Sequence, residues 1–135
     1  DIYLGQNKVD DALAVILPKQ RVVPENRALS FKLAEIYLMK NDFQASDRIV
    51  NKFIQKNARD ITAWNLLQRA ANLDTSNPLR TVNVLRYRAE AEYWKGTEET
   101  AIKSLLHAQR LAKDNNEKYE KIDFFSIFIT IFICF

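Results

Sequence analysis

The sequence predicts an all-α fold in which antiparallel helical hairpins stack as repeats. Residues 27–58 contain two apolar stripes at helical spacing, separated by a short polar break. The pattern recurs at an interval of 34 residues, so that Tyr37 corresponds to Tyr3 and Ser46 to Ala12. Two glycines and three prolines in 135 residues are too few for the turns of a β-rich fold.

A helix–turn–helix unit of 34 residues is typical of tetratricopeptide repeats (TPR). The small side chains of Ala12 and Ser46 suit positions where two helices approach closely. Pro24 falls where a second helix must end, because proline has no amide donor and clashes with the preceding turn. Trp64 falls where these repeats often carry a tryptophan. The chain therefore resembles the TPR family, which implies TPR-type antiparallel helix-hairpin repeats stacked into a right-handed superhelix.

The first half of the chain is assigned from apolar spacing and capping residues. Residues 1–4 are expected to be the last turn of a helix whose beginning is missing. A helix over about 8–19 follows, and further helices are expected from about Asn26 and about Asp42. Either Asn41 or Asp42 can cap the helix expected from about residue 42, by accepting hydrogen bonds from its free amides. The inward positions of the 8–19 helix are Ala12, Leu13, Ile16 and Leu17.

In the second half, Asp60 is expected to cap a helix that runs to about Leu73. Asn77 is then the expected cap, and Pro78 the first residue, of a long helix that ends near Lys95. The inward positions of the helix that Asp60 caps are Trp64, Leu67, Ala70 and Ala71. Those of the long helix are Val82, Leu85, Ala89 and Tyr93.

Gly96 is predicted to end the long helix in the left-handed conformation. Thr97 is the expected cap of the next helix, which should end near 114–116 and be followed by a short helix over about 117–123. The apolar stripe of the helix that follows Thr97 consists of Ala101, Leu105, Ala108 and Ala112.

Residues 86–113 resemble one particular group of proteins with TPR domains. An Arg-Ala-Glu, paired aromatics, a glycine turn and a closing Ala-x-x-Leu-Ala are similar to the last repeat of one group of proteins. These are bacterial periplasmic M48-type zinc metallopeptidases with a C-terminal TPR domain, the β-barrel assembly-enhancing protease group. Residues 63–70 resemble the same group's penultimate repeat. The resemblance implies a periplasmic location and a role in outer-membrane protein assembly and quality control.

No catalytic activity, metal or cofactor is expected of this chain. A zincin needs two histidines one helical turn apart with a glutamate as general base, and His107 is the only histidine. Cys134 is the only cysteine, so no disulfide framework is possible within the chain. The formal net charge of +3 is scattered, without a basic stripe interleaved with aromatics, and nucleic acid is therefore not an expected partner.

We expect the chain to bind protein through a groove lined by the first helix of each pair. Its polar groups suit an extended or helical polypeptide with acidic and apolar side chains. TPR domains that hold chaperone tails carry clamp residues where this chain has Phe31 and Glu35, so that class of ligand is not expected. The predicted groove residues are Phe31, Glu35, Leu38, Asn65, Arg69, Asn72, Arg86, Tyr87 and Glu90.

The sequence divides into a repeat domain over 1–123, with its first repeat truncated at the N-terminus, and an apolar tail over 124–135. The tail is too short to span a membrane as a helix, which needs about 20 residues. Three interpretations remain open: an altered C-terminus without selected function, a continuation of the last helix that packs in a groove, or contact with a membrane surface, which is disfavoured.

The functional prediction is a non-catalytic interaction scaffold that recruits substrates or partners to a periplasmic M48-type metallopeptidase. Its partners would be a protein or peptide, an upstream protease domain of the same protein, and the outer-membrane assembly machinery. The alternative is a TPR adaptor domain of an unrelated longer protein with no protease attached. A His-Glu-x-x-His motif in the gene upstream of Asp1 would favour the first.

Overall fold

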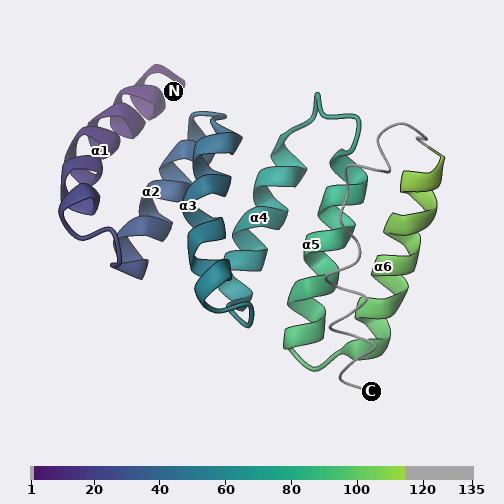
Figure 1. The fold of residues 1–135 in the computed structure, drawn as a ribbon. Coiled ribbons are helices and arrows are strands. Elements are labelled where there is room, and N and C mark those ends of the chain that lie inside the picture. The colour runs from purple at the N-terminus through teal and green to yellow at the C-terminus, as the bar shows by residue number, and fades with distance from the viewer. Residues whose placement is uncertain (1, 115–135) are drawn as a thin grey trace.

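The computed structural model describes residues 2–114, and this part of the chain folds as helices that follow one another in a row (Figure 1). Each helix packs against the next along the chain, and α2 also contacts α4. This arrangement confirms the predicted all-α repeat fold. The helices are α1 (Ile2–Val22), α2 (Arg27–Met39), α3 (Phe43–Lys56), α4 (Ile61–Leu73), α5 (Arg80–Trp94) and α6 (Glu98–Lys113). The predicted helix over 117–123 and the apolar tail over 124–135 lie outside the described residues.

Helix α1 differs from the expectation. It is continuous from Ile2 to Val22, whereas a break was expected between residues 4 and 8. Gly5 has no positive φ, and a helix tolerates an interior glycine at a cost of about 1 kcal/mol relative to alanine. Pro18 also lies inside α1. Proline removes one amide donor and clashes with the preceding turn, but the residues after it can still donate to carbonyls of the helix.

The turn between α2 and α3 explains how both polar residues of this break are used. Asn41 adopts a left-handed φ of 59°, and its amide donates to the Leu38 carbonyl. The amide of Asp42 donates to the Tyr37 carbonyl, which completes a Schellman motif. The Asp42 side chain then accepts a hydrogen bond from the Ala45 amide, so Asp42 is the residue that caps α3.

The entry to α5 is later than predicted. Asn77 accepts a hydrogen bond from the Leu79 amide, but Pro78 and Leu79 form a turn, and the helix begins at Arg80. The Arg80 guanidinium donates to both the backbone carbonyl and the side-chain oxygen of Asn72, at 2.7 and 2.6 Å. This link ties the first turn of α5 to the last turn of α4.

The turn between α5 and α6 matches the expectation in its backbone and not in its cap. Gly96 has a φ of 92°, and the amides of Gly96 and Thr97 donate to the carbonyls of Tyr93 and Glu92. The Thr97 side chain does not cap α6, because its hydroxyl donates instead to the Glu92 carbonyl. Backbone geometry and Glu98 in the first turn of α6 therefore mark its start.

Two apolar clusters lie in series along the row of helices. The first joins α2, α3 and α4, and the second joins α5 and α6. Tyr87 of α5 packs against the first cluster and so connects the two. The buried members of the first are Phe31, Ala34, Leu38, Val50, Ala63, Leu66, Leu67 and Ala70, and those of the second are Val82, Leu85, Ala89, Leu105, Ala108 and Ala112. Within residues 2–114, none of the helices has the length and apolar character required to cross a bilayer.

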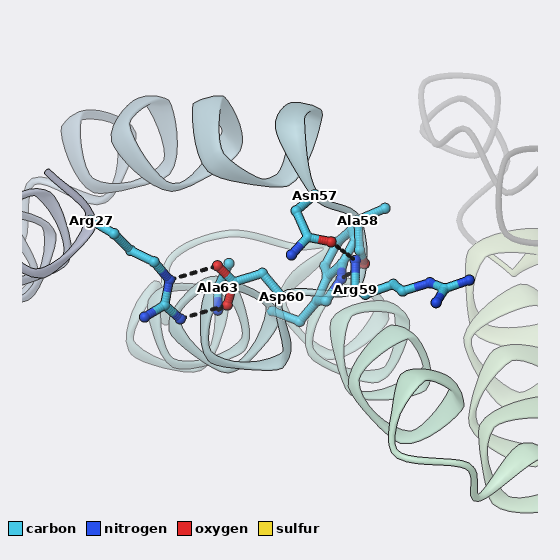
Figure 2. Close-up of polar contacts among 7 residues, drawn as sticks. Arg27, Asn57, Ala58, Arg59, Asp60 and Ala63 are labelled. Atoms are coloured by element: carbon cyan, nitrogen blue, oxygen red, sulfur yellow. Dashed lines mark hydrogen bonds and ion pairs between the residues drawn. The ribbon is translucent and has the colours of Figure 1, made fainter. Parts of the chain in front are cut away.

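An ion pair joins equivalent ends of consecutive repeats. Arg27, at the start of α2, donates through Nε and Nη2 to the two carboxylate oxygens of Asp60, at 2.9 and 2.7 Å (Figure 2). Asp60 also accepts from the Ala63 amide as the cap of α4. The hydrogen bonds from Arg27 hold the pKa of Asp60 below its usual value. The Arg27 side chain is 50% exposed and that of Asp60 is 8% exposed, and this bidentate contact links the first residue of α2 to the N-cap of α4.

Candidate functional site

The predicted groove residues separate into three groups in the structure. Asn65, Arg69 and Asn72 are exposed; Glu35, Arg86 and Tyr87 are partly buried; and Phe31, Leu38 and Glu90 are buried. The exposed group lies on one side of α4. The exposed part of the predicted groove is therefore smaller than expected, and it is centred on α4.

Phe31 and Leu38, predicted in the groove, lie instead in the core. Phe31 is 7% exposed and meets the ring of Phe53 edge to face at 5.2 Å. The guanidinium of Arg27 lies over the Phe31 ring, 4.4 Å from the ring centroid. Leu38 is 2% exposed. Both side chains belong to the apolar cluster that α2 forms with α3 and α4. Phe31 and Leu38 therefore contribute to stability.

The exposed residues of α4 line a concavity of about 330 Å³ between α4 and α5. We call it the α4–α5 concavity; its lining residues are Asn65, Gln68, Arg69, Asn72, Val84 and Arg88. The side chains of Asn65, Gln68 and Arg88 form no hydrogen bond or ion pair with any other residue in the described part of the chain. Two amides and a guanidinium therefore remain available to a ligand.

Arg69 connects this concavity to α2. Its Nη1 lies 3.8 Å from the Glu35 carboxylate, and both side chains are partly exposed, so the contact is weak, about 0–1 kcal/mol. Glu35 also lies 3.9 Å from Lys32. One helical turn further on, Met39 and Leu73 end their helices at positions 34 residues apart, and they are 60% and 47% exposed. Two exposed apolar side chains therefore lie one helical turn beyond the contact between Glu35 and Arg69.

Arg86 and Tyr87 do not line the concavity. The Arg86 guanidinium donates to the Tyr87 hydroxyl at 2.9 Å and lies 4.8 Å from the ring centroid. The Tyr87 ring packs against Trp64 of α4, at 6.2 Å between centroids. These two residues therefore join α5 to α4.

Near Arg86 lie two acidic side chains, of which Glu90 is buried and Asp47 is partly buried. Glu90 is 8% exposed, and burial raises its pKa to about 7, against the opposing influence of the Trp94 indole and the Arg86 guanidinium. Burial and the neighbouring Asp74 carboxylate raise the pKa of Asp47 to about 6, with Arg86 opposing. One oxygen of Asp47 is buried without a hydrogen-bond partner. Glu90 was predicted to line the groove and lies instead between helices.

The sequence interpretation missed Gln68, Val84 and Arg88. Residues 84 and 88 are one turn apart on α5, together with Arg80, and they lie on the opposite side of that helix from 86 and 90. An i, i+4 series that pairs one aliphatic residue with two arginines was the available signal. In residues 2–114 no group of three His, Cys, Asp or Glu side chains is placed to hold a metal ion.

Comparison with known proteins finds similarity to a bacterial protease. The β-barrel assembly-enhancing proteases of Escherichia coli K12, Shigella flexneri and Escherichia coli O157:H7 are each 36% identical to this chain over 70 residues. The aligned part is 52% of this chain and 14% of each protease. No family model and no solved structure matches. The similarity therefore concerns about half of this chain and a small part of each protease.

Proposed function

We propose that this chain is a non-catalytic, TPR-type protein-binding domain of a periplasmic M48-type metallopeptidase. It would recruit substrates or the outer-membrane assembly machinery and position them for the protease. The observation that carries the proposal is the α4–α5 concavity, where exposed amide and guanidinium groups without partners in the described chain stand beside an exposed apolar pair. Such a mixed surface suits a polypeptide better than a small molecule.

The similarity to proteases named for enhancing β-barrel assembly supports the choice of partner. An outer-membrane β-barrel protein diluted from urea is the direct probe, because its strands are extended and unpaired before assembly. The alternative, an adaptor domain with no protease attached, has the same surface and differs in what precedes the domain in the gene.

Replacing Arg69 with glutamate should weaken binding of that probe by about 1–3 kcal/mol, because a charged contact at an interface is lost and reversed. The thermal midpoint should change little, since the Arg69 side chain is 55% exposed and its only ion pair within residues 2–114 is weak. Fluorescence anisotropy with a labelled β-barrel protein measures the first effect, and circular dichroism measures the second.

Lys103→Glu is the matched control, because Lys103 is exposed on α6, and α5 lies between α6 and α4 in the row of helices (Figure 1). Unaltered binding by the Arg69 variant would place the recognition surface elsewhere. A large drop in its melting temperature would make Arg69 a structural residue.

The purified chain is expected to hold no stoichiometric zinc and to hydrolyse no unfolded protein. One histidine and one cysteine cannot supply the three or four protein ligands of a zinc site. Metal analysis by mass spectrometry, with casein as the test substrate, checks both expectations. One tightly held zinc per chain would show that the chain has a metal site of its own.

A further inference from the structure

Three exposed positions on α4 repeat at intervals of one helical turn. Asn65, Arg69 and Leu73 stand four residues apart and present an amide, a guanidinium and an aliphatic side chain in that order. Four residues of α-helix rise about 6 Å, and two residues of an extended chain span nearly the same length, about 6.6 Å. Alternate side chains of an extended segment laid along α4 would therefore meet successive members of this series.

The charge around the middle position is strongly positive. Arg69 and Arg88 line the α4–α5 concavity, and Arg80 stands at its edge with its guanidinium fixed on Asn72. Among the described residues, Glu35 forms an ion pair with Arg69 from the α2 side, while Arg88 on the α5 side has no ion-pair partner. A carboxylate placed between Arg69 and Arg88 would therefore be attracted by both.

Met39 of α2 supplements Leu73 at the apolar end of the α4 series. The 3.8 Å contact between Glu35 and Arg69 shows that residues 34 apart lie side by side on α2 and α4. Met39 and Leu73 are also 34 apart, one turn further along the same two helices, and both are well exposed. A large apolar side chain of a ligand would cover them both and remove apolar surface from water.

We infer that the surface selects an extended polypeptide segment in which an acidic side chain stands two residues from a large apolar one. The carboxylate would lie between Arg69 and Arg88, and the apolar side chain would lie on Met39 and Leu73. The amide of Asn65 would contact the segment two residues to the other side of the acid. This inference rests on the proposed function and names the chemistry of the bound polypeptide.

The test uses nine-residue peptides of serine and threonine, acetylated and amidated, that carry one glutamate and one leucine separated by one, two, three or four positions. Anisotropy titrations at low salt should show the two-position peptide binding about 10-fold more tightly than the one- and three-position peptides. An odd separation sends the two side chains to opposite faces of an extended segment.

Variants assign each contact. Arg88→Glu should weaken the two-position peptide about 10-fold and should prefer the same peptide with lysine in place of glutamate. Leu73→Ser should remove the preference for the two-position spacing, and Lys103→Glu should change nothing. Affinity that is independent of spacing, or unaffected by Arg88→Glu, would overturn the inference. So would equal binding of a peptide without glutamate that ends in a free carboxylate, because the chain terminus would then be the ligand.

The two proposals fail separately. If the chain binds the β-barrel protein and Arg69→Glu weakens that binding, while the peptides show no preference for spacing, the proposed function stands and the selected pattern is wrong. If neither the β-barrel protein nor any of the peptides binds, both are wrong.

Discussion

Replacing Glu90 with glutamine is expected to flatten the dependence of stability on pH between about 5 and 8. The pKa of Glu90 is about 7 in the folded chain, raised by burial from its ordinary value of 4.5. The folded state therefore holds a proton that the unfolded state has released. The stability that this proton contributes is complete below pH 4.5 and is lost as the pH rises through about 7.

The expected size of the effect is about 3 kcal/mol between acidic and alkaline conditions, and Glu90→Gln should be the more stable protein at pH 8 by a similar amount. Urea unfolding at pH 5, 6, 7 and 8 measures it. Asp47 also has a raised pKa, of about 6. In the Glu90 variant the free energy of unfolding should therefore still fall with pH at the acidic end, with a smaller slope, and Asp47→Asn should remove that slope. Glu99→Gln is the control, because the hydrogen bond from Lys103 lowers the pKa of Glu99 on a fully exposed side chain. A slope in the Glu90 variant equal to that of the parent would show that Glu90 is ionised in the folded chain.

Replacing Ala101 with leucine should lower the free energy of unfolding by about 1–3 kcal/mol, toward the upper end of this range. Ala101 is 0% exposed, so three additional carbon atoms must displace neighbouring groups. Its helix, α6, packs on α5 within the described chain, and Ala108 and Ala112 of the same stripe are also fully buried. Thermal unfolding followed by circular dichroism measures the loss.

Two leucine substitutions serve as controls for this prediction. Lys103 is exposed on α6, and Lys103→Leu should cost little. Ala12→Leu is the closer match, because the substitution is identical. The sequence suggested a close helix contact at Ala12 as well, but Ala12 is only partly buried on the continuous helix α1, so leucine should be tolerated there. Equal shifts in all three variants would show that the apolar stripe of α6 is wrongly assigned.

Most helix boundaries could be predicted from local features of the sequence. Asn26, Asp42 and Asp60 each accept a hydrogen bond from the third amide after them, as expected of helix caps, and Gly96 adopts the left-handed turn. These features depend on residues within one turn of each other. Thr97 and Pro78 show the limit of this approach, because a threonine hydroxyl can donate to a nearby carbonyl instead of accepting from a helix amide, and a proline can lie in the turn before the helix.

The continuity of α1 could not be predicted from spacing. The 34-residue correspondence placed a turn near Gly5, where the aligned repeat has Met39. Glycine allows a turn without requiring one, and the helix runs through it.

By itself the sequence determined the all-α class, the position of most helices and the apolar stripes of α5 and α6, because these follow from periodicity and capping along a single helix. Only the tertiary structure decided which polar side chains remain available to a ligand. Helical periodicity gives the angle between two residues on one helix, but the rotation of that helix against its neighbours depends on packing. That rotation buried Phe31, Leu38 and Glu90, left Asn65 and Arg69 exposed, and brought Val84 and Arg88 of α5 beside them.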